Sequence, residues 1–239
     1  MTPPEPCILL EWDSAFFNLR LARVTGDDLA QARRWCVEHE MDGAYLLIDS
    51  ARLDLIQSAE QQGFRLVDVR VTLDRFLEAG EADPIMKGRV RRATVDDIPT
   101  LESIARVNYG MTRFSVDPHF PQDRVEAMYA YWIAKSVNGG ANITWVTCDE
   151  QVITGYLSCL LHETDGQIGL VGVDPARQNQ GVGNALVCAG LRWFSEQGAQ
   201  RVTVVTQGRN IPAQRLYQKH GFRTASVMLW YHWWARDPE

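Results

Sequence analysis

One stretch of the sequence decides the fold, and it reads VGVDPARQNQGVGN at residues 171–184. The apolar, β-rich run at residues 167–173 predicts a strand, and the apolar periodicity that follows the stretch predicts a helix over about residues 182–197. A strand, a polar turn and a helix therefore follow one another. The first N–H groups of a helix have no partner within the helix and lie at the positive end of its dipole. The turn is thus suited to hold a phosphate group without a lysine.

The two glycines of the turn permit a close approach of an anion. Gly181 and Gly183 carry no Cβ, so the backbone is accessible at both positions. A helix start with permissive turn residues is an equally good explanation of such a pair taken alone. The sequence has no G-x-G-x-x-G followed by an acidic ribose partner, and no G-x-x-x-x-G-K-[ST]. Dinucleotide-binding and P-loop folds are therefore poor matches.

Part of the chain repeats at a separation of 158 positions, which aligns Arg34-Trp35 with Arg192-Trp193 and residues 63–65 with 221–223, both GFR. In each copy the periodicity predicts a helix, a strand, a helix and a strand, namely 27–40, 44–48, 53–62 and 65–73 in the first copy and 182–197, 202–205, 212–220 and 224–231 in the second. Two unrelated units of this kind would look similar at this level, so that alternative stays open.

The two copies differ where the turn is. The glycine turn aligns with residues 19–23, which contain no glycine, and Tyr217 aligns with Ala59. If the second copy is catalytic, the first has lost the chemistry. Residues 78–88, with Gly80, Pro84 and Gly88 among charges, are typical of a linker, and Thr94 is a good N-cap for a new helix. We therefore predict two domains, a degenerate N-terminal domain at residues 1–85 and a catalytic domain at residues 86–239.

Composition limits the classes of function. A chain of 239 residues with 46% hydrophobic residues is expected to be an ordered globular protein, and its net charge of -6 argues against nucleic acid as a partner. No apolar run reaches the roughly 18 to 20 residues of a membrane span, and the N-terminus has no signal-peptide pattern. We expect a soluble, cytoplasmic protein with no membrane contact. Five cysteines without a C-x-x-C pair and five histidines without ligand spacing predict neither a disulfide framework nor a metal site.

The turn and a second motif together resemble a known family. Q-x-x-G-x-G at residues 178–183, followed by NIPAQRLYQKHGF at residues 210–222, is similar to the GNAT acetyltransferase superfamily, and the similarity covers residues 89–232 in order. The resemblance implies the GNAT fold, an α/β (α+β) fold with a mixed central sheet, preceded here by a truncated GNAT-like N-terminal domain. It also implies acetyl-CoA as the acyl donor.

The resemblance assigns roles residue by residue. The CoA pyrophosphate would be held by Gln178, Asn179, Gln180, Gly181, Val182, Gly183 and Asn184. The strand with Val171 and Val173 would pair with the pantetheine amides while residues 202–205 splay away from it, and Asn210 and Ala213 would line the pantetheine arm. The family often has Arg or Lys in the turn, where this chain has Asn179 and Gln180; Arg177 or Arg209 is a candidate for compensating the missing charge.

Tyr217 would lie near the thioester sulfur and act as a proton donor. A phenol with an ordinary pKa of about 10 is protonated at neutral pH and can give its proton to a leaving thiolate. The alternative is a core aromatic on the inner face of a helix, packed against Phe222 and Trp230.

The acceptor is predicted from a second resemblance that covers nearly the whole chain. EWDSAFFN at residues 11–18 and YGMTRF at residues 109–114 are similar to the bacterial dTDP-fucosamine (dTDP-4-amino-4,6-dideoxygalactose) acetyltransferases of polysaccharide biosynthesis. The amine of a dTDP-linked amino-deoxy sugar is thus the expected partner, with Arg113 pairing with its diphosphate and Tyr109 or Phe114 stacking on it. Tyr129 and Trp132 are further stacking candidates, but their helical spacing also fits a core position.

Asp68 is the candidate proton acceptor. Leu66, Asp68 and Arg70 alternate with valines along one predicted strand, and related enzymes carry an acidic residue after the same G-F-x-L-V. Such a carboxylate could take a proton from the sugar ammonium, directly or through water; a solvated carboxylate paired with Arg70 is the alternative.

The expected mechanism is direct transfer in a ternary complex, because no cysteine is placed beside a histidine as an acyl-enzyme nucleophile would be. Rival hypotheses are a GNAT enzyme acting on a protein or antibiotic amine, and a non-catalytic acyl-CoA sensor. The sugar, the carbon that bears the amine and the length of the acyl group stay open. So does a homodimer through the aromatic residues 230–234.

Overall fold

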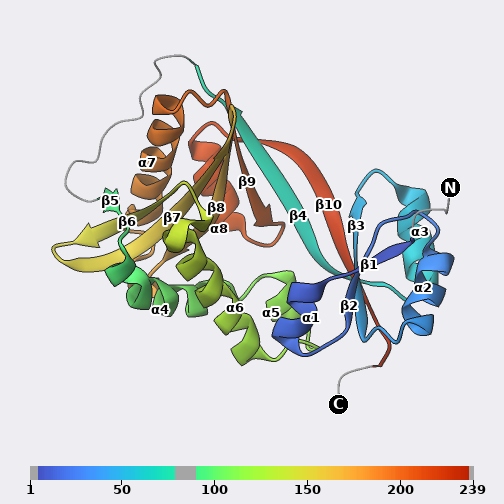
Figure 1. Ribbon diagram of the computed structural model, residues 1–239. Helices are drawn as coiled ribbons and strands as arrows, with labels where there is room; N and C mark the ends of the chain where they lie inside the picture. Colours follow the sequence, from blue (N-terminus) through green and yellow to red (C-terminus); the bar gives the residue numbers. More distant parts are fainter. Residues whose placement is uncertain (1–4, 79–89, 237–239) are drawn as a thin grey trace.

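The computed structural model describes residues 5–78 and 90–236, and its strands form one mixed sheet (Figure 1). The strand order is β1-β2-β3-β10-β4-β9-β8-β7-β6-β5. The first half of the chain supplies β1 (Cys7–Leu9), β2 (Leu21–Val24), β3 (Gly43–Asp49) and β4 (Arg65–Phe76). The second half supplies β5 (Val90–Arg92), β6 (Ile143–Asp149), β7 (Val152–His162), β8 (Asp165–Val173), β9 (Arg201–Gln207) and β10 (Arg223–Trp234). The predicted α/β fold with a mixed sheet is confirmed.

Helices cover both faces of this sheet. They are α1 (Glu11–Phe17), α2 (Leu29–Glu38), α3 (Leu53–Gln61), α4 (Ile98–Asn108), α5 (Arg113–Val116), α6 (Gln122–Lys135), α7 (Val182–Glu196) and α8 (Ile211–Lys219). Neighbouring residues of a strand point to opposite faces. Tyr45 packs with α4 and α6, whereas Leu46 packs with α2 and α3. Figure 1 shows α7 and α8 at one end of the sheet and α2 and α3 at the other. No described helix has the length and apolar character that crossing a membrane requires.

The predicted repeat is visible in the element bounds. β3, α3 and β4 occupy residues 43–49, 53–61 and 65–76, and β9, α8 and β10 occupy residues 201–207, 211–219 and 223–234. Each bound of the first set lies 158 positions before its counterpart, so the predicted helices and strands of both copies are confirmed within a few residues. Before these elements the copies differ in length, because α2 spans Leu29–Glu38 and α7 spans Val182–Glu196.

The strand pairing relates the two copies by an approximate twofold axis. Asp49 of β3 pairs with Met228 of β10, and Gln207 of β9 pairs with Arg70 of β4, which is the equivalent pair. β4 and β10 pair with each other, and Arg70 lies opposite Met228. The last strand of each copy is thus paired with the strand that precedes the last one in the other copy, β10 with β3 and β4 with β9. β10 is paired on both edges, so residues 230–234 pack inside the sheet.

Ungapped alignment fails before the first helix of each copy, α2 in the first and α7 in the second. Leu21 of β2 pairs with Gly43, and Asp165 of β8 pairs with Arg201, so β2 is the counterpart of β8. Residues 19–23 therefore lie largely in strand β2. The ungapped alignment, which made them equivalent to the glycine turn, is wrong at this point. The equivalent connection is residues 25–28, between β2 and α2. Apart from Glu78, the predicted linker at residues 78–88 and the boundary near residue 85 lie outside the described residues.

Thr94 forms the predicted cap. Its hydroxyl and the Asp97 carboxylate make a reciprocal capping box at a 3₁₀ turn, Val95–Asp97, that continues into α4. Arg91 donates two hydrogen bonds to the Asp97 carboxylate, at 2.7 and 2.8 Å. The cap fixes the start of the helix whose other end, at Asn108 and Tyr109, reaches the site.

Candidate functional site

The glycine turn presents an uncapped helix N-terminus. Gly181 precedes α7 with φ of 83°, in the left-handed region that suits glycine, and no side chain caps the helix. A Cβ on Gly181 would meet no atom within 4 Å, whereas one on Gly183 would come within 3.1 Å of the Leu216 side chain. Gly181 thus serves the turn and Gly183 allows α7 and α8 to pack closely. The first N–H groups of α7 are available to an anion.

β8 and β9 diverge beside this turn. They pair only from Asp165–Arg201 to Ile168–Val204, although both strands continue beyond those residues. A cavity of about 430 Å³ lies in the gap. Its lining includes Tyr109 and most of the residues predicted to hold the cofactor: Val171, Val173, Gln178, Asn179, Gly181, Val182, Gly183, Asn184, Asn210, Ala213 and Tyr217. Gln180 instead lines a neighbouring recess of about 80 Å³.

Tyr217 lies in α8 and lines the cavity. The residue is 4% exposed, and burial raises the pKa of its phenol well above the ordinary value. Its ring packs against Phe222 at a centroid distance of 5.9 Å, as the core alternative predicted, while Trp230 belongs to a different apolar cluster. Asn210 caps α8, because its side-chain oxygen accepts the N–H of Ala213 at 3.2 Å. A protonated hydroxyl therefore stands in the wall of the cavity.

Two side chains at the end of α4 occupy the free edge of β8. The Tyr109 hydroxyl donates to the carbonyl of Val171 at 3.2 Å, and the Asn108 side-chain oxygen accepts the N–H of Val173 at 3.2 Å. The Tyr109 ring stacks on Tyr129 with centroids 4.0 Å apart. An extended ligand that paired with this edge of β8 would have to replace both of these hydrogen bonds. No motif in the sequence pointed to Asn108.

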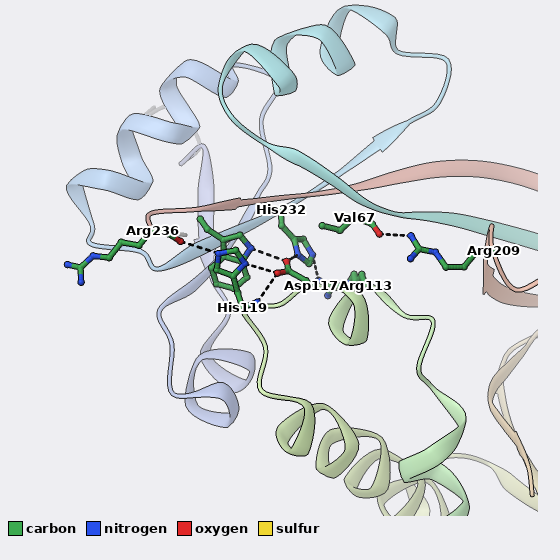
Figure 2. A network of polar contacts seen from close by, with 8 residues as sticks. Val67, Arg113, Asp117, His119, Arg209, His232 and Arg236 are labelled. Carbon is green, nitrogen blue, oxygen red and sulfur yellow. Dashed lines mark hydrogen bonds and ion pairs between the residues drawn. The ribbon is translucent and has the colours of Figure 1, made fainter. Parts of the chain in front are cut away.

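A buried polar network joins α5 and the residues after it to β10 (Figure 2). Asp117 accepts hydrogen bonds from His119 Nδ1 at 2.7 Å, from His232 Nδ1 at 2.6 Å and from Trp234 Nε1 at 3.0 Å. These donors hold the pKa of the Asp117 carboxyl well below its usual range despite burial. Since His232 donates through Nδ1, its Nε2 accepts from Arg113 Nη1 at 2.9 Å. Burial lowers the pKa of His232 to about 4, so this imidazole is neutral near pH 7.

Arg113 is held inside the protein by this network. Its guanidinium lies 4.1 Å from the ring centroid of Tyr45, 3.9 Å from that of Phe114 and 4.4 Å from that of Trp230. Burial lowers its pKa. Neither Arg113 nor Phe114 lines the cavity, and Phe114 is a core residue with 6% exposure. Sequence reasoning missed Asp117 and His232, which lie far apart in the chain and carry no motif.

Asp68 is buried, at 3% exposure, and does not line the cavity. Its Oδ1 accepts the N–H of Val69 at 2.8 Å and lies 3.8 Å from Arg209 Nε. Burial raises its pKa, and the charge of Arg209 partly offsets that rise. The alternative of a solvated carboxylate paired with Arg70 does not hold.

The strand around Asp68 is not regular. A register shift at Val67 interrupts the predicted alternation between Leu66 and Asp68. Figure 2 shows Arg209 reaching the carbonyl of Val67, to which its Nη2 donates at 2.7 Å. Arg209 therefore contacts Val67 and Asp68 of β4 and does not line the cavity at the glycine turn.

The other predicted compensating cation, Arg177, lines the cavity and pairs with Asp149 at 3.0 Å. In the described part of the chain, no group of three or more His, Cys, Asp or Glu side chains is placed to hold a metal ion.

Comparisons with known proteins agree with this geometry. Residues 108–222 match the acetyltransferase (GNAT) family. A crystal structure of a GCN5-related N-acetyltransferase from Sphaerobacter thermophilus superimposes with a TM-score of 0.68 at 16% identity, over 98% of this chain and 77% of that one. The chain therefore carries an acetyltransferase domain of the GNAT family, whose members use acetyl-CoA, and the predicted membership is confirmed.

Two relatives are similar over a larger part of the chain. The dTDP-fucosamine acetyltransferase of Escherichia coli O6:H1 is 27% identical over 92% of this chain and 95% of its own length. The spore coat polysaccharide biosynthesis protein SpsD of Bacillus subtilis is 26% identical over 66% of this chain, which spans about half (51%) of that relative. The mycothiol acetyltransferase of Saccharomonospora viridis is 41% identical, but over only 28% of this chain and 22% of its own length.

Proposed function

We propose that this protein transfers an acetyl group from acetyl-CoA to the amino group of a dTDP-linked amino-deoxy sugar. The observation that carries the proposal is the continuous cavity from the uncapped start of α7, along the gap between β8 and β9, to the hydroxyl of Tyr217. The nucleotide-sugar acceptor is supported by the dTDP-fucosamine acetyltransferase, which is similar over 95% of its length and so includes a counterpart of the first half of this chain.

The residues present fit CoA. The N–H groups of Val182, Gly183 and Asn184 begin a helix that no side chain caps, as a pyrophosphate requires. The edge of β8 at Val171 and Val173 is free of β9 and suits an extended amide chain. Acetyl-CoA supplies the thioester that the amine attacks and the thiolate that must be protonated on departure.

Tyr217 would be the proton donor to the leaving sulfur. Because burial raises the pKa of its phenol, the hydroxyl keeps its proton throughout the physiological pH range. Asp68 would take the proton of the sugar ammonium, through water, because its carboxylate lies outside the cavity lining. The raised pKa of Asp68 makes it a stronger base than an ordinary carboxylate.

The test is thiol release from acetyl-CoA across dTDP- and UDP-amino sugars, peptides and aminoglycosides. We expect turnover with a dTDP-amino sugar. A preference for a peptide or an aminoglycoside would favour the protein- or antibiotic-amine enzyme. CoA binding without turnover of any amine would favour the sensor.

Asp68 can be tested on the same substrate. Asp68→Asn should lower kcat/KM at least about 100-fold, whereas Asp74→Asn, the same change on the same strand, should have little effect. In the wild type, activity should fall with falling pH as Asp68 gains a proton, at a pH above the ordinary carboxyl range because its pKa is raised. The proposed chemistry fails if Asp68→Asn and Tyr217→Phe both keep wild-type transfer.

A further inference from the structure

The sheet face opposite α7 and α8 carries an arginine at the centre of the molecule. Arg70 of β4 is directly opposite Gln207 of β9 and Met228 of β10. Residues paired in antiparallel strands share a face, so these three side chains lie side by side. Val69 and Val71 point to the other face, where they pack with α7 and α8. Arg70, Gln207 and Met228 are all half-buried.

Arg70 has no counterion in the described part of the chain. Its Nε is buried and has no hydrogen-bond partner. Burial is the cause of its lowered pKa, and no carboxylate raises it. Two other arginines, on β9 and just after it, differ from Arg70, because Arg201 pairs with Asp74 at 2.8 Å and Arg209 lies 3.8 Å from Asp68. A partly desolvated guanidinium without an anion costs free energy.

The fold does not need this charge. The approximate twofold axis relates Arg70 to Met228, so the equivalent position in the other copy holds an uncharged side chain of similar length. Both residues lie in a strand that is paired on both edges, since Arg70 is opposite Gln207 and Met228, and Met228 is opposite Asp49 and Arg70. Packing at this position is therefore satisfied by methionine, and the charge of Arg70 requires a separate explanation.

Its location connects Arg70 with the cavity. Gln207 lines the cavity, and paired strands are about 4.8 Å apart, so Arg70 lies one strand away from a residue of the cavity wall. Asp68 precedes it by two residues on β4. A ligand bound at Arg70 would thus lie within reach of Asp68 and of the cavity, on the face that α7 and α8 do not cover.

We propose that Arg70 binds the diphosphate of the acceptor. A guanidinium can donate two parallel hydrogen bonds to a phosphate, and the buried Nε gains the partner that the protein does not supply. This inference rests on the proposed nucleotide-sugar acceptor. The sequence predicted that Arg113 would bind the diphosphate, but its guanidinium is held by His232 of β10. The inference gives this role to Arg70 of β4, the strand beside β10.

The experiment measures dTDP binding by calorimetry on protein saturated with CoA, so that the glycine turn is already occupied. The key variant is Arg70→Met, because methionine stands at the equivalent position and the fold should be kept, which the thermal midpoint checks. Arg70→Lys retains the charge. Arg34→Gln removes an exposed arginine of α2 and is the matched control. Inorganic pyrophosphate and succinate are parallel probes that distinguish a phosphate site from a carboxylate site.

We expect wild-type protein and Arg34→Gln to bind dTDP and pyrophosphate alike, Arg70→Met to bind them about 10- to 100-fold more weakly, and Arg70→Lys to recover part of the loss. Equal affinity of Arg70→Met and wild type, absence of dTDP binding to the wild type, or binding of succinate alone would each overturn the inference.

Transfer assays separate the two proposals. If dTDP-amino sugars are acetylated and Arg70→Met leaves their KM unchanged, the site at Arg70 is wrong and the proposed function stands. If no nucleotide sugar is acetylated but Arg70→Met still weakens dTDP binding, the proposed function is wrong and the anion site stands.

Discussion

The two copies of the repeat share a frame and differ at the start of one helix. In the second copy Gly181 leaves the first N–H groups of α7 uncapped. In the first copy the Asp28 carboxylate caps α2 by accepting the N–H of Gln31 at 2.9 Å, and Asp27 pairs with Arg52 at 2.9 Å. A helix N-terminus that is filled by its own carboxylate is closed to a phosphate. The repeat therefore builds two similar scaffolds, and we expect only the second to bind an anion, because only its helix start is left uncapped.

The cleft differs between the copies as well. β2 pairs with β3 up to Arg23 and ends at Val24, whereas β8 continues past its last pairing with β9 at Ile168. The position of Tyr217 is taken by Ala59, which is fully buried. We therefore expect one CoA site per chain. We expect the first copy to contribute to that site differently, because its last strand, β4, carries Asp68 and pairs with β9 from Arg70 onward.

The largest effect should come from the tyrosine that only the second copy has. Tyr217→Phe removes the proposed proton donor and should lower kcat about 100- to 10,000-fold, while CoA affinity and the thermal midpoint stay near wild type. Tyr231→Phe is the matched control, because Tyr231 is buried in the first copy's core and its hydroxyl donates to Glu60 at 3.4 Å, away from the cavity. Steady-state thiol release measures both variants. Equal activity of Tyr217→Phe and Tyr231→Phe would make Tyr217 a packing residue.

A smaller effect should follow from making the second turn resemble the first. Asn179 has φ of 61° and lines the cavity, and aspartate tolerates that conformation as asparagine does. Asn179→Asp places a carboxylate where the pyrophosphate is proposed to bind and should weaken CoA about tenfold, less so at high salt. Asp28→Asn, the reciprocal change, keeps a capping side chain and should leave CoA affinity unchanged. Calorimetry with CoA at two ionic strengths measures both, and an unaffected Asn179→Asp would place the pyrophosphate elsewhere.

The third effect concerns one strand position that the copies use differently. His232 of β10 is equivalent to Asp74 of β4, which forms a partly exposed pair with Arg201. The pKa of His232 is about 4 in the folded protein and about 6.5 in an unfolded chain. As pH falls from 6.5 towards 4, His232 gains a proton in the unfolded chain but stays neutral in the folded protein, so the free energy of unfolding decreases in that window.

His232→Gln should remove that loss. Urea unfolding at pH 7 and pH 4.5 should show a stability difference smaller than that of the wild type by about 1 to 3 kcal/mol. His162→Gln, at an exposed position, should behave as the wild type does. If His232→Gln and wild type lose the same stability on acidification, His232 is not a buried neutral imidazole.

Local patterns predicted the elements and the turn, but not the tertiary partners. The periodicity of residues 201–234 and the glycine turn are contained in short segments, so their helices, strands and cavity-lining residues follow from the sequence. Asp117 and His232 meet only because β10 lies between β3 and β4, a pairing that neither strand encodes by itself. The same pairing places Arg113 against His232, and among the described residues Arg70 has no paired carboxylate. Asp68 could be chosen from the sequence, but its burial depends on the bulge at Val67, for which no residue pattern gave a signal.

The smallest effect tests how the cleft of the second copy is closed in the absence of ligand. In the first copy β3 covers β2, whereas in the second copy the Tyr109 hydroxyl bonds the carbonyl of Val171 that the pantetheine is proposed to use. Tyr109→Phe removes the hydrogen bond to the Val171 carbonyl, which the wild type would have to break when CoA binds. CoA should therefore bind about two- to fivefold more tightly.

Tyr156→Phe is the control for this change, because the Tyr156 hydroxyl bonds the Tyr109 hydroxyl at 3.1 Å, whereas the hydrogen bond to the Val171 carbonyl comes from Tyr109. It disturbs the same pair of tyrosines without uncovering the strand edge, and CoA affinity should stay at the wild-type value. Calorimetric titration with CoA measures both variants. Weaker CoA binding by Tyr109→Phe alone would mean that the Tyr109 hydroxyl contacts CoA directly. The Val171 carbonyl would then not be the group that pairs with the pantetheine.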